Sequence, residues 1–149
     1  MLGPVPMRGF SQNVTFILSR RRYERDHPRG ERLARRLAEK LAGRGLEPSE
    51  VDIWRDGGWT FECAVGGHAL EVVLVQNREQ VWLLGIWPLK SPNFLIQVFS
   101  RRIHPAAPDC ARLAQFLDEA LRELGAAELR WRWDGHPENS DPERPISLG

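Results

Sequence analysis

Residues 50–100 follow the two-residue period of β-strands, in which apolar and polar side chains alternate, and short turns interrupt the pattern. The breaks include Asp56-Gly57-Gly58 and Gly66-Gly67, which are residue types favoured in tight turns. Connections this short join antiparallel neighbours, because a parallel crossover needs a dozen or more residues. The sequence therefore predicts an antiparallel meander of five strands at Val51–Arg55, Trp59–Val65, Ala69–Gln76, Val81–Trp87 and Phe94–Ser100.

Apolar residues at helical spacing predict one helix before the meander in the chain and one helix after it. The first is expected to carry Pro28 in its first turn and to end at Gly43 or Gly45. The second is expected from about Pro108 to Leu124, with Gly125 as its stop. The expected buried stripes are Leu33, Ala34, Leu37, Ala38 and Leu41 in the first helix and Cys110, Leu113, Phe116, Leu117, Ala120, Leu121 and Leu124 in the second.

A further strand is predicted towards each end of the chain, at Val14–Ser19 and at 128–133. The resulting order, β-α-β-β-β-β-β-α-β, predicts an α+β fold with an antiparallel sheet and two helices, and leaves open where the first and last strands insert. A length of 149 residues favours a single domain, expected over 1–134. Residues 135–149 are polar and Pro-rich and are expected to form a flexible tail, and Met1 and Met7 are alternative starts.

The composition excludes several classes of protein. With 42% hydrophobic residues, six Trp and six Phe, the chain is too apolar to be disordered. It has no apolar run near the roughly 20 residues of a membrane helix and no signal-peptide pattern, so a cytoplasmic location is expected. The net charge of +1 indicates no particular partner.

No motif of known chemistry is complete. The four histidines lack zinc-site spacing, and phosphate-binding, dinucleotide-binding and nucleophile-elbow motifs are absent. If Gly66-Gly67 forms a two-residue hairpin, Cys63 and His68 become diagonal neighbours about 7–8 Å apart, too far for a direct hydrogen bond. The same register places Glu62 opposite Glu71. We therefore expect no enzymatic activity, metal or cofactor, and an enzyme built on Cys63–His68 or Glu62/Glu71 is the third alternative.

Basic residues concentrate in the N-terminal third, where residues 1–48 carry 11 basic and 5 acidic side chains. The run Arg20–Arg22 and the arginines of the first helix raise nucleic acid as a partner. Interleaved carboxylates such as Glu31 and Glu39 favour a solvated helix face instead. A nucleic-acid-associated module that uses this basic third is the alternative function.

A pattern-level resemblance covers about residues 29–90. The segments GGWTFECAVGGHALEVVLV and VWLLGIW follow a Leu-rich helix, and this arrangement resembles small bacterial proteins of uncharacterised or immunity-protein type. The resemblance implies binding of another protein, often a toxin, by surface complementarity. No functional residue carries over from it. The expected function is therefore a non-enzymatic protein-binding module of a bacterial cytoplasm, of the immunity or chaperone-like kind.

The hairpin registers divide the strand residues between two faces. The expected core face consists of Phe61, Cys63, Leu70, Val72, Leu74, Val81 and Leu83. The expected opposite face mixes apolar and acidic groups, namely Thr60, Glu62, Glu71, Val73, Val75, Trp82, Leu84 and Ile86.

If both helices cover the first face, the second is an exposed apolar patch with a charged rim, which soluble monomers rarely leave without a partner. The predicted partner is another protein or a second copy of the chain, and the predicted binding residues are Trp82, Val73, Leu84, Glu62 and Glu71. Full burial of Trp82 within the monomer would contradict docking through this face.

Overall fold

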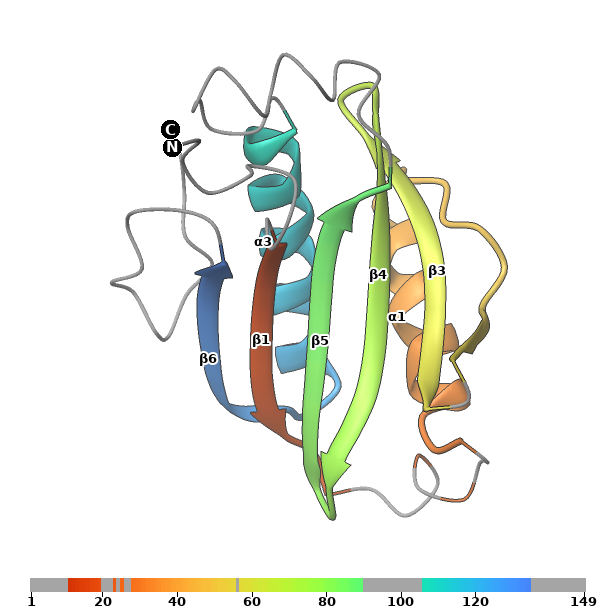
Figure 1. The fold of residues 1–149 in the computed structure, drawn as a ribbon, viewed down its shortest axis with the longest axis vertical. Helices are drawn as coiled ribbons and strands as arrows, with labels where there is room; N and C mark the ends of the chain where they lie inside the picture. Colours follow the sequence, from red (N-terminus) through yellow and green to blue (C-terminus); the bar gives the residue numbers. More distant parts are fainter. Residues whose placement is uncertain are drawn as a thin grey trace, which may run out of the picture.

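Six strands form one sheet in the order β2-β3-β4-β5-β1-β6, and all neighbouring pairs are antiparallel (Figure 1). The computed structural model describes residues 11–19, 23, 25, 28–55, 57–89 and 106–134. The strands are β1 (Ser11–Ile17), β2 (Asp52–Trp54), β3 (Gly58–Val65), β4 (His68–Arg78), β5 (Val81–Pro88) and β6 (Ala127–Asp134). The predicted α+β fold is confirmed, whereas the predicted strand Phe94–Ser100 and the predicted tail 135–149 lie outside the described residues.

The first and last strands are neighbours in the sheet. β1 pairs with β5 on one side and with β6 on the other, so β6 forms one edge and the short β2 forms the opposite edge. Residues far apart in the chain are therefore joined, because Asn13 lies beside both Gly85 and Arg132.

The two helices among the described residues lie on the same face of the sheet (Figure 1). They are α1 (Glu31–Ala42) and α3 (Ala107–Glu123), and they also contact each other. Contrary to the prediction, α1 begins after Pro28, because Gly30 adopts a left-handed φ of 107° at the N-cap. A Cβ at Gly30 would lie 2.8 Å from Trp82 Cζ3, so glycine is also required there by the close approach of an indole ring.

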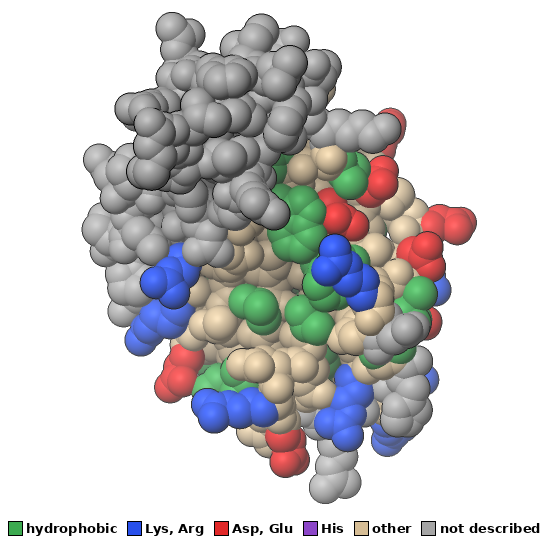
Figure 2. All heavy atoms as spheres, viewed as in Figure 1, with side chains coloured by type: hydrophobic (Ala, Val, Ile, Leu, Met, Phe, Trp, Pro, Cys, Tyr) green, Lys and Arg blue, Asp and Glu red, His purple; other side chains and the backbone are tan. Residues whose placement is uncertain are grey.

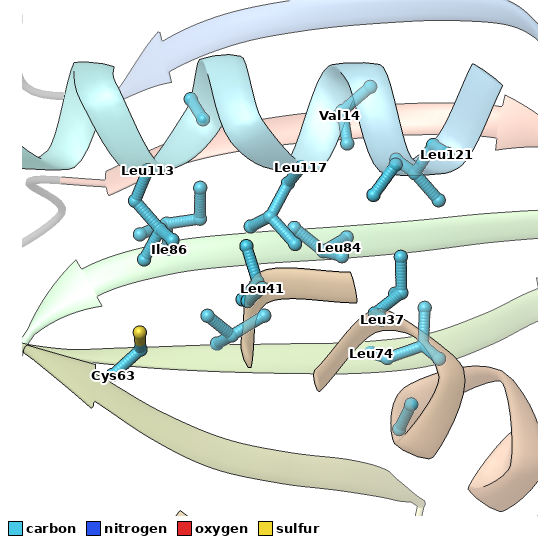
Figure 3. Close-up of a cluster of buried hydrophobic side chains, with 14 of the residues drawn as sticks. Val14, Leu37, Leu41, Cys63, Leu74, Leu84, Ile86, Leu113, Leu117 and Leu121 are labelled. Carbon is cyan, nitrogen blue, oxygen red and sulfur yellow. The ribbon is translucent and has the colours of Figure 1, made fainter. Parts of the chain in front are cut away.

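The core fills the space between the helices and the sheet (Figure 3). Leucines of α1 and α3 face the buried side chains of β1, β3, β4 and β5. The predicted helix stripes are confirmed, except that Phe116 is only partly buried. The residues labelled in Figure 3 are Val14, Leu37, Leu41, Cys63, Leu74, Leu84, Ile86, Leu113, Leu117 and Leu121.

The register of the β3–β4 hairpin is confirmed, and that of the β4–β5 hairpin is wrong. Val65 lies opposite His68 as Gly66-Gly67 predicted, and Phe61, Cys63, Leu70, Val72 and Leu74 are buried. The β4–β5 ladder, however, shifts between Gln76 and Arg78. Because this bulge adds one residue to β4, the side chains of β5 exchange faces relative to an unbroken ladder. The strand therefore buries Trp82, Leu84 and Ile86 in the core and places Val81 and Leu83 on the other face.

Candidate functional site

The sheet face opposite α1 and α3 is not covered by a helix in the part of the chain that the structure describes. We call it the open face. Two rows of directly paired residues cross all six strands on it, and Figure 2 views this face. One row is Asp52, Thr60, Val73, Gly85, Asn13 and Arg132. The other is Trp54, Gly58, Val75, Leu83, Thr15 and Arg130.

Apolar side chains occupy the middle of the open face (Figure 2). Trp54, Val75, Leu83 and Trp87 are each half-buried, and the ring centroids of the two tryptophans are 6.4 Å apart. Gly85 makes room for the indole of Trp87, because a Cβ there would lie 2.9 Å from Trp87 Cζ3. The centre of the face therefore carries aromatic and aliphatic surface that is only partly removed from water.

Acidic groups border this apolar centre on the side of β2, β3 and β4. The Glu71 carboxylate accepts a hydrogen bond from Trp87 Nε1 at 2.9 Å and another from the Thr60 hydroxyl, also at 2.9 Å. Glu62 lies directly opposite Glu71 and is exposed. A pocket of ≈ 520 Å³ opens here, lined by Ser49, Glu50, Val51, Asp52, Thr60, Phe61, Glu62 and Glu71. Four carboxylates around one pocket favour a cationic group as its occupant.

Basic groups border the same face on the opposite edge. Arg130 and Arg132 project from β6 and are exposed. Arg55, near the acidic side, lies with its guanidinium carbon 5.0 Å from the centroid of the Trp54 ring, which is a cation–π contact. The open face is therefore polarised, with acidic groups on β2–β4 and arginines on β6.

The five predicted binding residues divide between the two faces. Glu62, Glu71 and Val73 belong to the open face, although Val73 is only 2% exposed. Trp82 and Leu84 are fully buried on the helix side, and Trp82 Nε1 donates a hydrogen bond to the Leu18 carbonyl at 3.1 Å. Docking through a face that contains Trp82 is therefore wrong. The apolar groups that do lie on the open face, Trp54, Leu83 and Trp87, were not selected from the sequence because the bulge reverses the alternation along β5.

The structure places Cys63 and His68 in different surroundings. Cys63 is buried in the core, and burial raises the pKa of its thiol. His68 instead contacts α3, where its Nδ1 lies 2.6 Å from Asp109 Oδ2. No pattern in the sequence indicated the contact between His68 and Asp109, since Asp109 is 41 residues further along the chain.

Three basic side chains of α1 have acidic neighbours. Arg35 pairs with Glu31 within the helix, and Arg36 pairs with Glu39. Lys40 reaches across to Glu123 of α3 at 2.7 Å. These contacts reduce the uncompensated positive charge of the helix face, and Arg20–Arg22 lie outside the described residues.

Comparison with protein-family models, with curated proteins and with solved structures finds no match to this chain. Within the described residues, no helix has the length and apolar character needed to cross a membrane. The same residues contain no group of three or more His, Cys, Asp or Glu side chains placed to hold a metal ion.

Proposed function

We propose that this protein is a protein-binding module whose binding surface is the open face. The observation that carries the proposal is the set of half-buried side chains Trp54, Val75, Leu83 and Trp87 on a sheet face that bears no described helix. Soluble monomers rarely leave contiguous apolar surface of this kind without a partner.

The chemistry of the open face agrees with that of protein interfaces. Aromatic side chains and arginine are enriched at such interfaces, and a polar rim surrounds an apolar centre. Trp54 and Trp87 supply the aromatic groups, and charged side chains border them on both sides. Binding of another protein is also what the resemblance to immunity-type proteins implies, and a toxin as the partner remains a prediction.

A photo-crosslinking amino acid at Leu83 tests this proposal in cells that produce the protein. The matched control carries the same amino acid at Arg35, which is exposed on α1 and lies away from the open face. We expect a discrete crosslinked protein product from position 83 and none from position 35. Absence of a product at position 83, or the same products from both positions, would overturn the proposal.

A further inference from the structure

The charges of the open face are complementary to those of a second copy, and the partner inferred from them rests on the binding surface proposed above. We propose that the partner is a second copy of this chain, packed face to face about a twofold axis that runs parallel to the strands between β4 and β5. The two rows of paired residues that cross the sheet determine which groups would meet.

A twofold axis in this direction keeps each row opposite the same row of the second copy and reverses its order. In the first row, Arg132 at one end is then placed opposite Asp52 of the second copy. The ≈ 520 Å³ pocket lined by Asp52 and three glutamates lies at this end, so the guanidinium enters an acidic pocket. The twofold axis repeats this contact, so the dimer contains it twice.

The second row contributes an apolar contact. At its ends, Arg130 is placed opposite Trp54 of the second copy, whose ring already has the Arg55 guanidinium carbon 5.0 Å from its centroid. At the centre of this row, Leu83 is placed opposite Val75. Apolar groups therefore meet in the middle of the second row, and opposite charges meet at both ends of the first row.

Other arrangements of two copies bring like charges together. A twofold axis perpendicular to the strands would place the β2–β4 carboxylates over their own counterparts. Pairing of two β6 edges would bring Arg130 and Arg132 of both copies onto one side of a continuous sheet. Like charges at adjacent positions are destabilising, so the charge pattern favours the axis along the strands.

The size of the face sets the expected affinity. Five strands of seven or more residues and the three-residue β2 span at most about 24 Å by 23 Å, so two faces cover up to about 1,100 Å². This area lies near the lower limit of specific interfaces, at about 1,000–1,200 Å². We therefore expect a reversible dimer that dissociates in the micromolar range, with a strong dependence on salt because charged edges contribute to a small interface.

Charge reversal at the two ends of the first row gives a sharp test in the full-length protein. Arg132→Glu places two acidic groups at each end contact, and Asp52→Arg places two basic groups there. Sedimentation velocity should show the wild-type dimer. Each variant alone should form a dimer whose dissociation constant is higher by about tenfold or more. An equimolar mixture of the two variants should associate again, because both end contacts then join opposite charges.

The control for folding is the thermal melting temperature of each variant, which should stay close to that of the wild type because Asp52 and Arg132 are exposed. If the Asp52→Arg variant fails to fold, the Glu62→Arg variant is used in its place. Restored association in the mixture supports the proposal. A wild-type chain that remains monomeric, a dimer that charge reversal leaves unchanged, or a mixture that stays monomeric would overturn it.

The crosslinking result distinguishes this inference from the proposed function. A product of twice the chain mass from position 83 supports the self-pairing. A product with a different protein, together with a monomeric wild type, overturns the self-pairing and keeps the proposed function. Absence of any product at position 83 overturns both.

Discussion

At the scale of single residues, Gln12 is a polar side chain in an apolar site. It is fully buried on the helix side of β1, opposite Ile86, and neither atom of its amide group has a hydrogen-bond partner among the described residues. An amide buried without partners costs about 1–3 kcal/mol of stability. The position therefore lowers the stability of the fold.

Replacing the Gln12 amide by an apolar group of similar shape should stabilise the protein. We expect Gln12→Met to raise the free energy of unfolding by about 1–2 kcal/mol, because the unpaired amide is removed with little change in volume. Urea denaturation measures this change. Thr15→Met on the exposed side of β1 is the control and should change the midpoint much less. A lower midpoint for Gln12→Met would show that the amide is paired in solution.

The two cysteines are expected to be unreactive in the folded protein. Both thiols are buried, and desolvation raises the pKa of Cys110 from 9.0 to about 12 and raises that of Cys63. At pH 8 a thiol reagent should therefore label neither cysteine until denaturant is added. Labelling of Cys63 in native buffer would contradict its place in the core.

The same pKa shift predicts a loss of stability in alkali. A thiol whose pKa is raised by folding stabilises the folded state fully below its unfolded pKa, and this contribution is lost as the pH rises from about 9 towards 12. Cys110→Ala should reduce the slope of unfolding free energy against pH in this range. Equal slopes for the variant and the wild type would indicate that the thiol is not desolvated.

At the scale of secondary-structure elements, the two hairpins explain what could be predicted from the sequence. Gly66-Gly67 fits a two-residue turn, so the β3–β4 register and its buried residues followed directly. The β4–β5 connection contains Asn77, Arg78, Glu79 and Gln80, and these residue types do not show where a bulge lies. Because β4 contains one extra residue, the alternation in the sequence assigned Trp82 and Leu83 to the wrong faces. The neighbours of β1 and β6 depend on tertiary packing and were not predicted.

Two adjacent leucines of β5 test this register. Leu84 is fully buried in the core, and Leu83 lies on the open face. Leu84→Ala should lower the free energy of unfolding by about 2–5 kcal/mol, as should Leu74→Ala, because each leaves a cavity. Leu83→Ala should cost less than about 1 kcal/mol in the monomer. A larger loss for Leu83 than for Leu84 in urea denaturation would show that the bulge is misplaced.

A polar contact between His68 and Asp109 joins the β3–β4 hairpin to α3. The Asp109 carboxylate lies 2.6 Å from His68 Nδ1 and close enough to Gly66 that a Cβ there would overlap it. Asp109→Ala should therefore speed amide hydrogen exchange at residues 65–69 and lower the free energy of unfolding by about 1–2 kcal/mol. The β4–β5 turn provides the internal control and should exchange at an unchanged rate. Faster exchange at both turns would indicate general destabilisation instead.

At the scale of the whole molecule, the charges of the two halves of the chain are brought together by the fold. Arg44 near the end of α1 pairs with Glu119 and Glu123 of α3, and Lys40 also contacts Glu123. These cations hold the pKa of Glu123 below its ordinary value. Part of the excess positive charge of residues 1–48 is therefore balanced on the helix side of the molecule. The charged groups of the open face are other residues, on β2, β3, β4 and β6.

Oxidative footprinting at rising protein concentration tests most directly whether the open face binds a second copy. In dilute solution Trp54, Leu83 and Trp87 should be oxidised, and Trp82 should be protected by the core. As the concentration passes through the micromolar range, the first three should become protected. Ile53, which is 44% exposed on β2 and faces away from the open face, should stay equally reactive. Oxidation of Trp54, Leu83 and Trp87 that does not change with concentration would contradict the account.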